Sequence, residues 1–230
     1  MKLVGERRAL SAVIFAFYAL LYFVLGMSNG SEFTRALYAL AGVYGLAFFA
    51  LVAGYFWARW YAVGVALYGV LTGAVGLWQV GPEPVIVFLA ATHVAAALML
   101  WGDAMSASYD GQTAWRERYH MDEPAVNRLG RSVIRAGVSL PMVLLYALAP
   151  KSAGSALAIS VAVLALLGFR GLVRMKTWGV LALGAAGATL LAAAAVQHGP
   201  ATVMPAITGG LVAWAVLPFA RPMLRFVARG

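Results

Sequence analysis

The chain has 230 residues, of which 63% are hydrophobic and 11% are charged, and it carries a formal net charge of +9 and no cysteine. Soluble domains are about 45–50% apolar and about 25% charged, so this composition excludes a water-facing globular domain. The lack of cysteine excludes disulfides, thiolate metal sites and cysteine nucleophiles.

The first predicted element is an apolar stretch over 9–27 that follows the cations Lys2, Arg7 and Arg8. This order of charge and apolar residues also occurs in secretory signal peptides. Their apolar core is about 7–15 residues long, however, and the stretch here is longer. We therefore predict an uncleaved first membrane span.

Seven further apolar stretches follow, and each is close to the ~20 residues that a helix needs to cross a bilayer. Lipid offers no hydrogen-bond partner to the backbone, so the spans must be helices. Glycine, proline and polar residues separate several of them, which is typical of turns. The predicted fold is an all-α, polytopic transmembrane bundle with eight spans, at 9–27, 34–56, 60–80, 84–102, 131–149, 153–171, 177–197 and 201–220.

The positions of the charges predict which ends of the spans face the cytoplasm. If the N-terminus is inside, the inner segments hold all of the 17 lysines and arginines except Arg35 and Lys151. The acids Glu32 and Glu83 balance those two on the outer side. An excess of cations on one side marks the cytoplasmic face. We expect a prokaryotic-type inner membrane, cytoplasmic N- and C-termini, anionic lipid headgroups as partners of the inner face, and no nucleic acid.

An internal repeat is indicated by sliding the chain along itself by 118 residues. Gln79-Val80-Gly81-Pro82 then aligns with Gln197-His198-Gly199-Pro200, and Trp60 aligns with Trp178. The offset covers four spans, so the two halves insert in the same direction, as in a parallel repeat. We expect two four-helix halves related by a pseudo-two-fold axis along the membrane normal, at 1–106 and 131–230, joined by a cytoplasmic linker at 107–130.

The linker is the only long polar stretch. Trp115 and Tyr119 lie four residues apart beside arginines, which is typical of a short helix on a membrane surface. Asp122 followed by Pro124 predicts the start of a helix that continues into the fifth span.

Two groups of arginines recur at helical spacing, so each group lies on one helix face. They are Arg128, Arg131 and Arg135, and Arg221, Arg225 and Arg229. One interpretation is that they only fix the topology. The other is that they bind anionic lipid headgroups or a cytoplasmic partner, since a cation near such a surface contributes about 1 kcal/mol.

His93 is the only ionisable residue predicted deep within a span, and Thr92 precedes it. It can form a hydrogen bond to a neighbouring helix, ligate haem, carry a proton or contact a substrate. A bis-histidine haem site would need a second buried histidine, but the repeat mate of His93 is Leu211. Asp103 lies about 15 Å further along the helix, at its inner end. We predict no cofactor and no metal.

Gln79 and Gln197 are repeat mates near the outer surface. They either cap helices or line a vestibule shared by the two halves. With His93, Thr92 and Asp103 they form a candidate polar site between the halves.

Catalysis is not indicated, because the spans contain no carboxylate pair, no metal motif and no workable serine–histidine pair. The leading hypothesis is therefore a non-catalytic subunit or scaffold of a membrane assembly, with other membrane subunits as partners. The alternatives are a small transporter or a protein that binds lipid or a neutral solute between the halves, and a membrane protein that binds haem or quinone.

Overall fold

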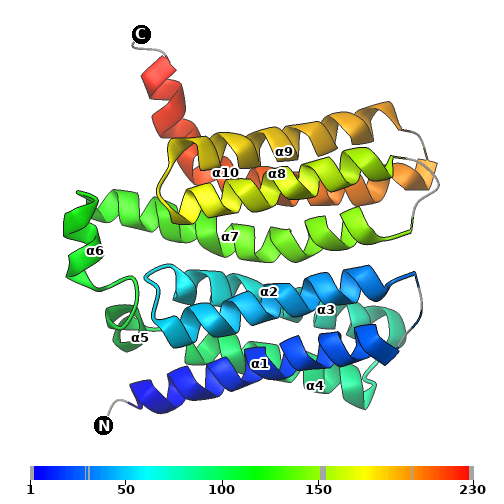
Figure 1. The fold of residues 1–230 in the computed structure, drawn as a ribbon, viewed down its shortest axis with the longest axis horizontal. Helices are drawn as coiled ribbons and strands as arrows, with labels where there is room; N and C mark the ends of the chain where they lie inside the picture. Colours follow the sequence, from blue (N-terminus) through cyan, green and yellow to red (C-terminus); the bar gives the residue numbers. More distant parts are fainter. Residues whose placement is uncertain (1–2, 29, 31, 151–153, 198, 228–230) are drawn as a thin grey trace.

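The computed structural model describes residues 3–28, 30, 32–150, 154–197 and 199–227, and within these ranges the secondary structure is entirely helical (Figure 1). Seven of the helices are long and apolar enough to cross a membrane. The prediction of an all-α membrane bundle is confirmed at this level. The long helices run side by side along the longest axis of the molecule, as Figure 1 shows.

The first half of the chain forms four long helices. They are α1 (Val4–Ser28), α2 (Thr34–Ala53), α3 (Ala58–Val80) and α4 (Pro84–Met99). Each packs against the next in the chain, and α4 also contacts α1. The four helices therefore form a closed bundle with its own buried centre.

The second half repeats this arrangement. Its helices are α7 (Glu123–Leu148), α8 (Ser155–Val173), α9 (Thr177–Val196) and α10 (Val203–Val227), with the 3-10 turn η1 (Gly199–Thr202) before α10. Neighbours in the chain again pack together, and α10 closes the bundle against α7. Two short helices, α5 (Asp103–Ala107) and α6 (Thr113–Arg118), connect the halves.

The eighth predicted span corresponds to α4, which has 16 residues and falls short of the other seven helices. Its length is about 24 Å at 1.5 Å per residue, less than the ~30 Å of a hydrocarbon core. The helix ends early because Gly102, with φ of 102°, turns the chain away. Arg7 caps the exposed end by donating hydrogen bonds to the carbonyls of Leu98 and Met99 at 3.2 and 2.9 Å.

The predicted helix start at Asp122 is confirmed. The Asp122 carboxylate accepts a hydrogen bond from the backbone N–H of Ala125 at 2.8 Å, and Pro124 lies in the first turn of α7. Asp122 thus satisfies a backbone donor that has no partner within the helix. The helix then continues without a break through the predicted fifth span.

Several cations at the end of the molecule that holds α5, α6 and the N-terminus bind other parts of the protein. Arg8 donates to the carbonyl of Val52 at 2.7 Å, at the end of α2, where Gly54 adopts a left-handed conformation. Arg59 makes two hydrogen bonds to the carboxylate of Asp110, at 2.5 and 2.7 Å, and Ser106 donates to the same carboxylate. Asp110 is 4% exposed, so this ion pair fixes the linker to the first half.

The linker is packed more deeply than its polar sequence predicts. Trp115 is buried, and its ring stacks on Phe56 at a centroid distance of 4.4 Å and meets Trp60 edge-on. Tyr119 is exposed. Of the two aromatic residues expected at a membrane surface, Trp115 therefore contacts protein.

The two halves meet along α7, which packs against α3 and also contacts α2. The closest approach joins two glycines. A Cβ on Gly64 would lie 2.2 Å from the carbonyl oxygen of Ile134, and a Cβ on Gly137 would lie 2.8 Å from that of Tyr61. Only residues without side chains allow the two backbones to touch in this way.

This junction shows that the expected pseudo-two-fold axis is wrong. Such an axis would place α9 against α1 in the same way as α7 packs against α3. Figure 1 instead shows α1 and α9 on opposite sides of the molecule, and the packing of α7 on α3 has no such counterpart among the described residues. The halves therefore lie side by side, without a two-fold axis on which a shared vestibule could form.

Pro218 opens a gap in the hydrogen bonding of α10, and α7 fills it. Proline has no N–H, so the carbonyl of Trp214 lacks its usual donor four residues later. Arg135 donates to this carbonyl at 3.0 Å and places its guanidinium over the Trp214 ring, 4.6 Å from the centroid. Ser132 donates to the next carbonyl, that of Ala215, at 2.6 Å.

We expect Arg135→Met to lower the free energy of unfolding by about 1–3 kcal/mol, the cost of leaving a backbone acceptor without a partner away from water. In a Pro218→Ala background the loss should be smaller, since the alanine restores an N–H for the Trp214 carbonyl. Unfolding in mixed detergent–SDS micelles measures both. Equal losses in the two backgrounds would show that Arg135 does not act through this carbonyl.

Candidate functional site

His93 and Thr92 belong to a polar cluster in the centre of the first half. The His93 side chain is fully buried, and the Tyr44 hydroxyl lies 2.7 Å from its Nε2 atom. Tyr18 meets Thr92, with 2.6 Å between the two hydroxyl oxygens, and the Tyr18 ring lies 4.3 Å from the imidazole centroid. Three helices, α1, α2 and α4, thus supply the cluster.

The hydrogen bonds define how His93 is protonated. Its Nδ1 atom lies 2.7 Å from the backbone carbonyl of Leu89, which can only accept, so Nδ1 carries the hydrogen. Nε2 of the neutral ring then accepts the hydrogen bond from Tyr44. The ring is also fixed by shape, because a Cβ on Gly69 would lie 1.9 Å from its Cδ2 atom.

Both nitrogens of His93 are therefore occupied by protein. A bond from either one to haem iron would have to displace Tyr44 or the Leu89 carbonyl. Among the described residues no group of three histidines, aspartates or glutamates could hold a metal ion. The cluster fits a satisfied polar core of the first half, as the hydrogen-bonding interpretation of His93 expects.

The remaining residues of the predicted polar site lie elsewhere. Gln79 and Gln197 are exposed at the ends of α3 and α9, and Asp103 is exposed where α5 begins. His93 lies within the first half and away from the junction with α7. The structure thus brings together only His93 and Thr92, with Tyr18, Tyr44 and Gly69 as the neighbours that the sequence did not identify.

The arginines of the two predicted cationic faces also lie in different surroundings. Arg128 is half-buried, Arg131 is exposed, and Arg135 binds the Trp214 carbonyl. Arg221 and Arg225 lie on α10, where the structure describes the backbone alone, and Arg229 lies outside the described residues. Of the three arginines on α7, Arg135 is bound to another helix. Arg128 and Arg131 make no hydrogen bond or ion pair with the residues that the structure describes.

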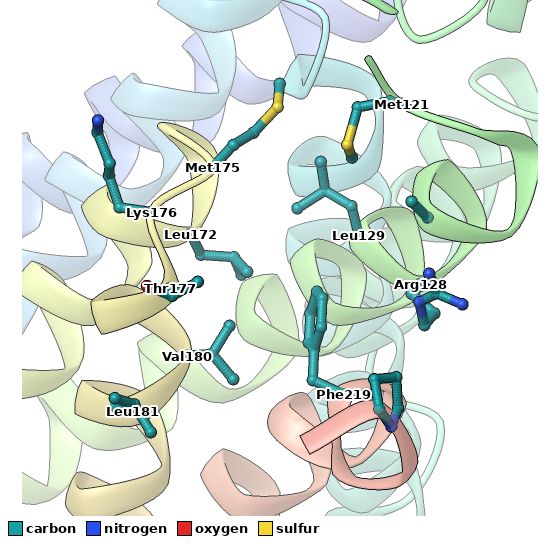
Figure 2. Close-up of a pocket in the computed structure, with 12 residues that line it drawn as sticks. Met121, Arg128, Leu129, Leu172, Met175, Lys176, Thr177, Val180, Leu181 and Phe219 are labelled. Carbon is teal, nitrogen blue, oxygen red and sulfur yellow. The ribbon is translucent and has the colours of Figure 1, made fainter. Parts of the chain in front are cut away.

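A pocket of about 660 Å³ opens beside Arg128, at the same end of the molecule as α6 (Figure 2). Its volume falls within the ~300–1,000 Å³ of typical small-molecule sites. The walls come from the start of α7, the turn between α8 and α9, the first turns of α9 and the end of α10. They consist of Met121, Ala125, Arg128, Leu129, Leu172, Met175, Lys176, Thr177, Val180, Leu181, Phe219 and Pro222.

The lining of this pocket is almost entirely apolar. Figure 2 shows Leu129, Leu172 and Val180 around the central space, with Arg128 and Lys176 on opposite sides of it. The lining includes two cations and no acid. Such an apolar interior can accept a hydrocarbon chain, and Arg128 is the cation beside it.

Sequence reasoning identified Arg128 but not the rest of this pocket. Leu172 and Lys176 come from one segment of the chain and Phe219 comes from another, and their meeting with Arg128 depends on how the second bundle closes. The sequence did offer one signal for Lys176. It lies directly before the predicted seventh span, at the same predicted membrane face as Arg128.

Comparison with protein-family models, with curated proteins and with solved structures finds no match to this chain.

Proposed function

We propose that this chain is a multi-pass protein of a prokaryotic-type inner membrane that binds a lipid-like amphiphile at its cytoplasmic boundary and has no catalytic role. The pocket between α7, α9 and α10 carries this proposal. Its apolar walls favour a hydrocarbon chain, since burial of apolar surface contributes about 25 cal/mol per Å².

The proposed topology has eight crossings, with α4 as the short one. The C-terminal ends of α1, α3, α7 and α9 lie at one end of the molecule in Figure 1. The start of α1 and the end of α10 lie at the other end, with α5 and α6. This is the arrangement that an even number of crossings requires. The bias of lysine and arginine toward the second end supports its assignment to the cytoplasm.

The proposed tandem repeat is supported by matching packing in the two halves. Each half closes its four helices in the same cyclic order. The repeat mates Gly69 and Gly187 both bring the third helix of their half close to the fourth, since a Cβ would meet His93 in one case and Ala213 in the other. A duplicated four-helix unit accounts for both observations.

The test is whether the purified full chain retains lipid in this pocket. Native mass spectrometry of the protein extracted in mild detergent should show one tightly held phospholipid. Val180→Trp and Leu181→Trp place an indole on the pocket wall and should remove it. Leu181 is 56% exposed, so this second variant changes the pocket without a buried substitution.

Leu157→Trp, on the exposed surface of α8 and outside the pocket lining, is the matched control and should keep the lipid. Equal retention by the pocket variants and the control would contradict the proposal.

A role as a subunit or scaffold of a membrane assembly is the second candidate. The observation that favours it is the rigid attachment of the linker by Arg59 and Asp110, which holds the exposed surface of α6 in a fixed position. Co-purification with a partner after mild extraction, lost when exposed Glu117 and Arg118 of α6 are replaced, would support it.

A further inference from the structure

We propose that the ligand of the pocket is an anionic phospholipid, with its phosphate beside Arg128 and an acyl chain along the apolar walls. This inference rests on the proposed function, because it names the class of amphiphile that the same pocket holds.

The interior of the pocket suits an acyl chain. Leu129, Leu172 and Val180 are buried at 3%, 2% and 8% exposure, and their side chains form the inner wall. Met121 and Met175 lie at the upper edge of the central space in Figure 2. Methionine is flexible and polarisable, so these two side chains can adapt to chains of different shape.

The cationic side chains of Arg128 and Lys176 have no bonding partner in the part of the protein that the structure describes. Arg7, Arg8 and Arg59 bind carbonyls or a carboxylate at the same end of the molecule. The side chains of Arg128 and Lys176, in contrast, make no hydrogen bond or ion pair with the residues that the structure describes. Figure 2 places the two on opposite sides of the pocket and shows the Lys176 ammonium directed away from its space. With no acid in the lining, the charge of Arg128 is left for an anion from outside to balance.

The position of the pocket decides for a lipid as the source of this anion. Arg128 lies in the second turn of α7, Lys176 directly precedes α9, and Phe219 lies near the end of the apolar part of α10. These helix ends mark the boundary between hydrocarbon and headgroups, where a phospholipid places its phosphate. A free phosphate ion would gain nothing from the apolar walls.

The test is a competition between phosphatidylglycerol and phosphatidylcholine with identical acyl chains. The purified full chain in detergent receives both lipids at equal concentration, and native mass spectrometry counts the bound molecules of each. We expect wild-type protein to prefer phosphatidylglycerol. A cation near an anionic headgroup contributes about fivefold in affinity, so Arg128→Gln should reduce the preference by roughly fivefold.

The matched control is Arg131→Gln, which removes the same charge from an exposed residue of the same helix that does not line the pocket. It should keep the preference. An equal loss in the control would overturn the proposal by showing only a general attraction to the cationic end, and so would a wild-type protein without preference. Addition of about 10 mM inorganic phosphate, an order-of-magnitude excess over lipid, should displace nothing, and displacement would assign the site to free phosphate.

The pocket variant Leu181→Trp separates the two proposals. If it removes both lipids while Arg128→Gln leaves the preference unchanged, the pocket binds an amphiphile and the anionic class is wrong. If it removes neither lipid, the pocket is not a lipid site and both proposals fail.

Discussion

Gly64→Val is expected to lower the free energy of unfolding by about 3 kcal/mol, the upper end of the usual cost of overpacking. The added side chain meets backbone, since its Cβ would lie 2.2 Å from the Ile134 carbonyl oxygen and 2.8 Å from the Cα of Gly137. A side chain can rotate away from such a contact, but a helix backbone cannot. The α3–α7 junction must therefore open, and the two halves must separate locally.

The measurement is an SDS titration of the protein in detergent micelles, followed by tryptophan fluorescence. Gly42→Val is the matched control, because Gly42 lies on α2 with nothing within 4 Å of an added Cβ. Both changes carry the same change in helix propensity and add the same side chain. If the two variants unfold at the same SDS fraction, the two glycines do not form the junction between the halves.

Asp110→Ala is expected to cost about 3–5 kcal/mol, because it leaves a mostly buried guanidinium without its counter-ion. The side chains of Arg59 and Asp110 are 15% and 6% exposed, and two hydrogen bonds join them. Loss of the pair should also release α5 and α6 from the first half, so proteolysis within the linker should become faster. Replacement of both partners, Arg59→Met with Asp110→Leu, should recover much of the stability.

Glu123→Ala provides the control for an ion pair in solvent. Glu123 binds Arg116 at 2.9 Å, but its side chain is 64% exposed. Such pairs contribute about 0–1 kcal/mol, so this variant should remain close to wild type in stability and in resistance to protease. A loss in Glu123→Ala as large as that in Asp110→Ala would show that burial does not set the strength of these pairs.

The helices could be predicted from sequence because their signals are local. A run of apolar residues and the turn residues beside it identify a span, and Asp122 with Pro124 identifies the start of α7 without knowledge of its neighbours. The packing between helices depends on contacts between distant residues, and it was predicted less well. Gly64 and Gly137 look like any other glycines in the sequence until α3 and α7 are placed against each other.

The roles of the arginines likewise depend on contacts with distant residues. Positive charge near helix ends predicts a membrane orientation, but it does not distinguish an arginine that caps a carbonyl from one that remains available. Arg7 and Arg135 have acceptors on other helices, at Met99 and Trp214. Pro218 was a readable signal for the second case, because a proline within a helix leaves one carbonyl without its donor.

The candidate site illustrates why the polar residues of a membrane protein are an incomplete guide. His93 attracted attention as a buried ionisable group, and the structure gives it two hydrogen bonds within the first half. The pocket beside Arg128 is lined mainly by apolar residues such as leucine, methionine and valine, which are common throughout the sequence. The pocket differs from the rest of the bundle in its shape, and no single type of residue in the sequence identifies that shape.

The membrane topology, on which the site assignments rest, can be tested through α4, the shortest of the proposed membrane-crossing helices. The chain has no cysteine, so each of the variants Glu83→Cys and Asp103→Cys has a single thiol. The first thiol lies just before α4 and the second lies just after it. Labelling of intact cells with a membrane-impermeant maleimide should modify the Glu83→Cys variant at once and the Asp103→Cys variant only after permeabilisation. Labelling of both thiols from the same side would contradict the account, since α4 would not cross and the pocket beside Arg128 would lose its assigned place at the cytoplasmic face.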